Sequence, residues 1–171
     1  MKRMLVGTLA TLAVTTSLLL VASATADNSR NFNAHLSGDE EVPPRATRAQ
    51  GQVNFKVSKD GSSIHYKLIV ANIENVVGAH IHLAPAGVNG PIVVHLFSGV
   101  AGSGRSQGVI AQGTIEADDL TGPLAGQEIE DLVEAMNEGE TYVNVHTNDG
   151  VAPPNTGPGD FPGGEIRGQV D

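Results

Sequence analysis

The sequence predicts an all-β domain, an antiparallel sandwich or barrel of about eight strands with one short helix. Short runs with an apolar residue at every second position recur along the chain, and this alternation is typical of strands that bury one face. The 171 residues include 21 Gly and 9 Pro, and only 4% are aromatic. This composition indicates short strands joined by many turns.

The predicted strands are alternating or continuous apolar runs bounded by turn residues. Along the chain they span 32–36, 51–57, 63–70, 76–83, 91–97, 108–116, 142–147 and 164–170. Alternation points every second side chain inward, and the predicted core includes Phe55, Leu68, Ile81, Val93, Val143 and Val145. Lys59-Asp60-Gly61 is a turn signal, so the second and third strands should form a hairpin. The mostly apolar run 91–97 is predicted to be a central strand.

One helix is predicted over 127–137. Its apolar residues recur at the spacing of one helical face, and they are Ile129, Leu132, Val133 and Met136. Gly139 suits the helix end. The segments rich in Gly, Pro and polar residues are predicted loops, and they span 37–50, 98–107 and 148–163. The acidic pairs Glu40-Glu41 and Asp118-Asp119 fall in turns and are expected to be solvated.

Residues 1–26 are typical of a secretory signal peptide. Lys2 and Arg3 form a short basic region, residues 4–21 are mostly apolar, and Ala24-Thr25-Ala26 supplies a small-residue cleavage signal. Polar sequence follows at once, which disfavours an uncleaved membrane anchor. We therefore expect a single mature domain over 27–171 and a secreted or periplasmic location.

The charge and cysteine content exclude several classes of function. The formal net charge is −9, and it becomes −11 when Lys2 and Arg3 leave with the leader. Such an acidic domain offers no basic surface for nucleic acid or anionic lipid. The chain has no cysteine, which excludes disulfides and thiolate metal sites. A metal would have to be held by imidazole, carboxylate or carbonyl groups.

The main chemical signal is a pair of histidines in the fourth predicted strand. His80 and His82 flank Ile81, and in a strand such i, i+2 residues point to the same face. Two imidazoles on one face form a two-point chelate that suits copper, zinc, iron or nickel.

A further histidine has a similar setting in the seventh predicted strand. His146 shares its face with Tyr142 and Asn144, while the valines between them point the other way. The sequence therefore predicts a metal site of His80, His82 and His146, with His95 as a candidate fourth ligand. Copper is the first choice and zinc the second, since copper heads the affinity order of divalent ions. Because imidazoles titrate at a pKa of about 6.5, the affinity should fall through that pH.

Three stretches together resemble the CHRD family, which is named after the animal protein chordin and includes exported microbial proteins. They are LSGDEEVP at 36–43, GAHIHLAPAGVNGPIV at 78–93, and the segment 142–169 that begins YVNVHTNDG and ends FPGGEIRGQ. The resemblance implies a β-rich extracellular domain. The residues that fall at characteristic positions of the family are His80, His82, His146, Glu165 and Arg167. In chordin these domains belong to a secreted antagonist of growth factors, so an extracellular protein or small ligand is an expected partner.

The histidine order is also similar to the copper site of copper–zinc superoxide dismutases. In that resemblance His80, His82 and His146 would bind copper, His95 would bridge to zinc, and Arg167 would guide the anionic substrate. It implies an immunoglobulin- or superoxide-dismutase-like Greek key and a copper-dependent redox activity such as superoxide dismutation. The chain lacks the further zinc-site histidines and the disulfide cysteines of those enzymes, so the activity stays open.

Two functions therefore compete: a transition-metal-binding domain, and an adhesive or ligand-binding module whose histidines only bond to loops. Ring nitrogens far beyond about 5 Å from one another would exclude a shared ion. Tyr142, Asn144 or Glu165 could support the ligands, although Glu165 could equally pair with Arg167. His65 is expected on the plain surface. Asp149 and Asp160 could form a calcium site with loop carbonyls.

Overall fold

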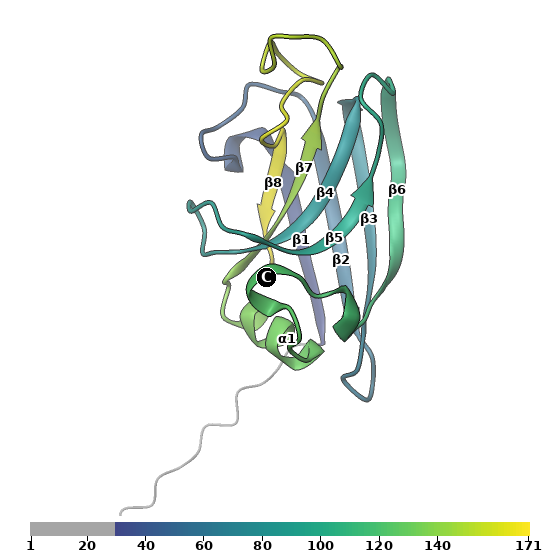
Figure 1. Ribbon diagram of the computed structural model, residues 1–171, viewed down its shortest axis with the longest axis vertical. Helices are drawn as coiled ribbons and strands as arrows, with labels where there is room; N and C mark the ends of the chain where they lie inside the picture. The colour runs from purple at the N-terminus through teal and green to yellow at the C-terminus, as the bar shows by residue number, and fades with distance from the viewer. Residues whose placement is uncertain (1–29) are drawn as a thin grey trace, which may run out of the picture.

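The computed structural model describes residues 30–171. They form one eight-stranded antiparallel sheet that curls into a nearly closed barrel, with a single α-helix below it (Figure 1). The all-β prediction is confirmed, and the sheet takes the form of a barrel. The leader predicted over 1–26 lies outside the described residues.

The elements follow the predicted order along the chain. The strands are β1 (Asn31–Ser37), β2 (Gln50–Val57), β3 (Ile64–Glu74), β4 (Val76–Leu83), β5 (Ile92–Ser98), β6 (Arg105–Ile115), β7 (Thr141–Thr147) and β8 (Ile166–Gln169). The helices are three 3₁₀ turns, η1 (Gly38–Glu40), η2 (Ala117–Asp119) and η3 (Gly122–Leu124), and α1 (Ile129–Asn137). In the sheet the strands are ordered β5-β4-β7-β8-β1-β2-β3-β6.

Most strand ends lie within three residues of the prediction; the end of β3 differs more, and one strand lies elsewhere in the sheet. β3 continues to Glu74 through a bulge at Asn72, whose φ of 55° bends the chain without ending it. This extension pairs with the start of β6 at Arg105. The prediction that 91–97 forms a central strand is wrong, because β5 stands at one end of the sheet order. It is apolar because the barrel nearly closes there, and the Tyr66 hydroxyl donates to its Leu96 carbonyl at 2.8 Å.

The barrel interior is the hydrophobic core. All six predicted core residues are at most 2% exposed, so the strand faces follow the alternation of the sequence. Leu132 and Met136 of α1 join this core. The helix begins at Ile129, after a capping box formed by Glu128 and Asp131, and Gly139 follows it with a φ of +69°. Each fully buried aliphatic side chain contributes roughly 1.5–3 kcal/mol of burial free energy.

The outer face of β4, β7 and β8 is polar and is also covered. In β7 every residue is buried except His146, which is half-buried. Loops 38–49, 84–91 and 148–165 contact this face through hydrogen bonds to Asn144, His82 and His146, respectively. The main histidine signal of the sequence therefore lies between the barrel and a layer of loops. Within the described residues, no helix has the length and apolar character needed to cross a bilayer.

Candidate metal site

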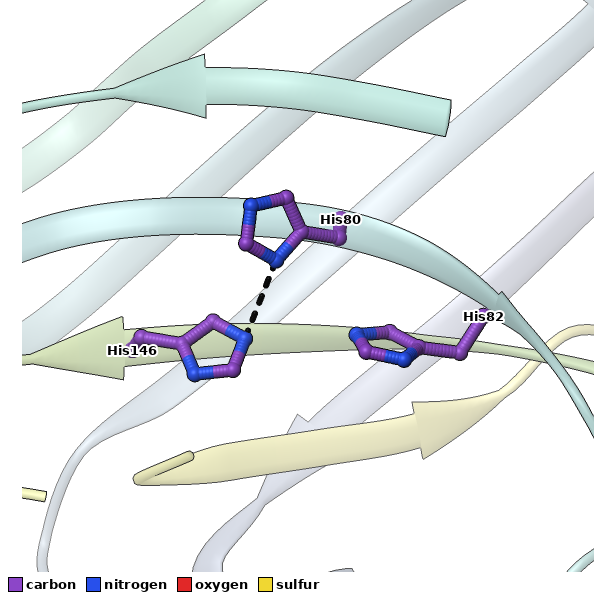
Figure 2. A group of neighbouring side chains, drawn as sticks. All are labelled: His80, His82 and His146. Atoms are coloured by element: carbon purple, nitrogen blue, oxygen red, sulfur yellow. Dashed lines mark hydrogen bonds between the residues drawn. The ribbon is translucent and has the colours of Figure 1, made fainter. Parts of the chain in front are cut away.

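Three histidines converge on the outer face of two neighbouring strands. β4 pairs with β7 so that His80 lies opposite Asn144, His82 opposite Tyr142 and Gly78 opposite His146. One ring nitrogen each from His80, His82 and His146 lies within 4.8 Å of the other two. Figure 2 shows the three rings turned toward one another, with the hydrogen bond between His80 and His146 dashed.

The spacing of these nitrogens fits a shared metal ion. Tetrahedral ligands at bonds of about 2.0–2.1 Å lie roughly 3.3 Å from one another. The Nδ1 of His80 and the Nε2 of His146 are already 3.1 Å apart. The remaining separations, at most 4.8 Å, require an inward movement of the rings by about 1 Å or a little more. The three histidines therefore fit one ion.

The hydrogen bonds fix which nitrogens carry protons. The Nδ1 of His82 lies 2.9 Å from the Gly90 carbonyl, and the Nδ1 of His146 lies 2.9 Å from the Pro162 carbonyl. A carbonyl only accepts, so both Nδ1 atoms must donate, and in neutral rings both Nε2 atoms keep their lone pairs. The Nδ1 of His80 must then be the donor in its bond to His146. The inward set is Nδ1 of His80 and Nε2 of His82 and His146.

Burial keeps all three rings neutral. It lowers the pKa of His80 to about 3, assisted by the neighbouring histidines. It also lowers the pKa of His82 and of His146, against the opposing effect of their carbonyl hydrogen bonds. Neutral imidazole is the form that binds metals, so the site is poised for an ion without losing protons. This moves the pH at which protons compete with the ion below the value of about 6.5 expected from the sequence.

Packing holds two of the rings in place. The His82 ring stacks on Tyr142, with centroids 4.7 Å apart and planes 10° apart. Its Nε2 is buried and has no hydrogen-bond partner, as a ligand atom awaiting an ion would be. The His80 ring lies over Gly78, where an added Cβ would meet two ring atoms at 3.2 and 3.3 Å. The absence of a side chain at Gly78 makes room for this ring.

His95 lies beside the site and does not join the converging set. It is exposed and pairs with His80 across β4 and β5. The two rings meet edge to face with centroids 4.8 Å apart. His65 is exposed, as predicted, and its Nδ1 bonds to the Thr114 hydroxyl.

Arg167 does not occupy the solvent-facing position that an anion guide requires. Its side chain is 2% exposed, and its guanidinium lies 3.4 Å from the centroid of the Tyr142 ring. Its N–H groups donate to three acceptors of loop 84–91, which are the carbonyls of Pro85 and Val88 and the side-chain oxygen of Asn89. The guanidinium therefore directs its hydrogen bonds to the loop and does not face solvent.

Glu165 orients no imidazole and forms no pair with Arg167. Its buried carboxylate accepts hydrogen bonds from the hydroxyls of Thr47 and Thr147 and from the Gly159 N–H. It ties loops 38–49 and 148–165 to β7. The ligand rings are oriented by the carbonyls of Gly90 and Pro162, which no side-chain pattern in the sequence could reveal.

Glu41 is a further buried residue of this region that the sequence placed wrongly. It is 4% exposed, whereas its acidic, proline-rich surroundings predicted a solvated side chain. The Asn144 amide donates to both of its carboxylate oxygens at 3.1 and 3.2 Å. Burial raises the pKa of Glu41 to about 7, although Arg167 and Arg45 act to lower it. Glu41 lies in the motif LSGDEEVP at 36–43, and this motif was the one feature of the sequence that could have singled it out.

One oxygen of each loop carboxylate considered for calcium has a hydrogen-bond partner, while the Oδ1 of Asp160 is buried without one among the described residues. The Oδ1 of Asp149 accepts from the Val151 N–H. The Oδ2 of Asp160 accepts from the N–H and hydroxyl of Thr156. Neither belongs to a cluster of metal-ligating groups in the described part of the chain, so the calcium prediction gains no support.

The fold and site define an antiparallel β-barrel domain with a loop-covered histidine cluster. The chain belongs to the CHRD family, because the family model described as CHRD domain matches residues 32–170. The resemblance seen in the sequence is thus confirmed over nearly all of the described chain. No curated protein and no solved structure matches, so the likeness to superoxide dismutases rests on the order of the histidines alone.

Proposed function

We propose that this CHRD domain is an extracellular module that binds one transition-metal ion, copper in the first place and zinc in the second. The observation that carries the proposal is the convergence of one ring nitrogen from each of His80, His82 and His146. Three imidazoles and an open fourth position are a recognised ligand set for either metal. The acidic chain, with a net charge of −9, attracts cations.

The chemistry of binding follows from the proton positions. His82 and His146 present bare Nε2 atoms because their Nδ1 protons are held by backbone carbonyls. His80 must break its bond to His146 and move its proton from Nδ1 to Nε2. No net proton leaves the three rings, because all are neutral beforehand.

The residues favour binding of a cation over turnover of an anion. Superoxide dismutation would need a positive group facing the open coordination position. Arg167 is buried and donates to loop 84–91, and the net charge of the protein repels anions. A copper-dependent redox activity toward an uncharged substrate stays compatible with the site.

The second candidate is a ligand-binding or adhesive module without a metal. The hydrogen bonds of His82 and His146 to loop carbonyls favour it, because they would serve equally to hold the loops. A secreted or periplasmic location, and an extracellular protein or small molecule as partner, belong to both candidates.

Calorimetric titration of the metal-free domain with zinc, and with copper(II), distinguishes the two. Wild type should take up one ion, and His80→Ala combined with His82→Ala should abolish uptake. His65→Ala is the matched control, because this ring is exposed and bonds only to Thr114. Equally weak uptake by wild type and the double variant would end the metal proposal in favour of the second candidate.

A further inference from the structure

Three planar groups follow one another across the outer face of β4, β7 and β8. The His82 ring stacks on the Tyr142 ring, and the Arg167 guanidinium lies over that same Tyr142 ring. β4 and β8 flank β7 on opposite sides, so Tyr142 lies between the other two. Tyr142 and Arg167 are each 2% exposed, and a stack this buried leaves its members little freedom.

The same residues hold the loop that orients His82. Arg167 donates to the Val88 carbonyl at 2.9 Å and to the Asn89 side chain at 3.2 Å. The Tyr142 hydroxyl accepts from the Gly90 N–H at 3.2 Å. The Gly90 carbonyl in turn accepts the Nδ1 proton of His82 at 2.9 Å.

We propose that Arg167 and Tyr142 are positioning residues of the metal site, which fix the plane and the tautomer of His82. The proposal rests on the proposed function. The ends of the loop are held by the Leu83 N–H, which donates to the Pro91 carbonyl, and by Gln169, which donates to the Ala84 carbonyl. Residues 85–89 between them are exposed, and Arg167 and Tyr142 supply bonds at Val88 and at Gly90 itself. Without them the His82 ring can turn and its proton can move to Nε2, and the ring then no longer offers a bare nitrogen to the ion.

Three variants separate the contributions. Arg167→Met removes the guanidinium and keeps an unbranched stem. Arg167→Lys keeps the charge but loses the planar group that stacks and donates at several points. Tyr142→Phe keeps the stack and loses the acceptor for Gly90. Arg105→Met is the matched control, because it makes the same change at an exposed arginine of β6 that bonds to the Gln107 side chain, outside loop 84–91.

Two measurements on each variant test the idea. The first is the zinc affinity, which should fall about 10-fold or more in Arg167→Met and Arg167→Lys, as is usual when the support of a ligand histidine is lost. Tyr142→Phe should weaken zinc binding less, and Arg105→Met should leave the zinc affinity unchanged. The second is the nitrogen NMR spectrum of the His82 ring in the metal-free protein. Wild type should show a single Nδ1-protonated form, and the arginine variants a mixture.

The positioning role of Arg167 and the metal proposal can fail independently of each other. Unchanged zinc affinity and a single His82 tautomer in both arginine variants would overturn the positioning role while leaving the metal site intact. If wild type itself binds no metal, the proposed function fails, and the tautomer measurement alone decides whether Arg167 positions His82. Should Arg167→Met not fold, as its thermal unfolding would reveal, Arg167→Lys and Tyr142→Phe carry the decision.

Discussion

The protons on three imidazoles set how the site responds to pH. His80, His82 and His146 are neutral in the folded protein because burial lowers the pKa of each. In the unfolded chain they titrate near the usual pKa of about 6.5. Protonation therefore favours the unfolded metal-free chain as the pH falls below that value, and the folded site resists protonation until a lower pH.

Metal binding to the folded protein should accordingly release almost no protons between pH 7 and pH 8. Titrations with zinc in buffers of different ionisation enthalpy should give the same apparent enthalpy once buffer–metal binding is subtracted. The affinity should change little across this range. Release of about one proton per ion at the lower end of this range would show that at least one ligand ring is charged beforehand, and would contradict the burial argument.

At the scale of the element, the loop 38–49 covers part of the outer face of β7 and buries it. It brings Glu41 against Asn144, and its Thr47 hydroxyl donates to Glu165. Gly164 closes over the pair, since an added Cβ there would lie 2.5–2.8 Å from Asn144 and Glu41 atoms. The loop thus contains a carboxyl group that is costly to ionise.

Replacing this group should change how stability depends on pH. Burial raises the pKa of Glu41 to about 7, so the folded state holds its proton more tightly than the unfolded chain. The stabilisation is fully present below about pH 4.5 and is lost as the pH rises to about 7. Glu41→Gln should therefore gain in free energy of unfolding relative to wild type, by ~1–3 kcal/mol between pH 4.5 and pH 8.

Urea unfolding of the metal-free proteins at several pH values measures this difference. Comparing the variant with wild type cancels the histidines, which titrate in both. Glu40→Gln serves as the control, because Glu40 is exposed in the same loop. A difference that stays constant with pH would show that Glu41 is ionised in the folded protein at the lower pH as well.

For the whole molecule, one continuous core carries the stability. The chain has no cysteine, so disulfides do not contribute. The core runs through the barrel and includes residues of every strand, although the mostly exposed β6 supplies only Ile115 as a fully buried member. Stability should then respond strongly to single changes on the inner face.

Val143→Ala tests this directly, because Val143 is 0% exposed at the centre of β7. Loss of its two buried methyl groups should lower the free energy of unfolding by about 1–3 kcal/mol. Val109→Ala on β6 is the matched control: Val109 is 48% exposed, and its truncation should cost roughly 0.5 kcal/mol or less. Equal effects of the two changes in urea unfolding would contradict a core centred inside the barrel.

The sequence by itself determined which side chains share a face. Alternation is a local property with a period of two residues, so it predicted that His80 and His82 point together and that Val143 and Val145 point inward. The same locality predicted the helix around Leu132 and the hairpin at Lys59-Asp60-Gly61. The family followed from short motifs, which are local as well.

Only the tertiary structure decided how these faces meet. The pairing of β4 with β7 brings His146 to His80, and strands so distant in the chain are matched by the packing of the whole barrel. The carbonyls of Gly90 and Pro162 reach the rings of His82 and His146 because two loops fold over these rings. Every residue has a backbone carbonyl, so the sequence does not indicate which ones will bond to a side chain. Glu41 is buried and β5 lies at the sheet's end for the same reason: loop coverage and strand order depend on the free energy of the complete fold.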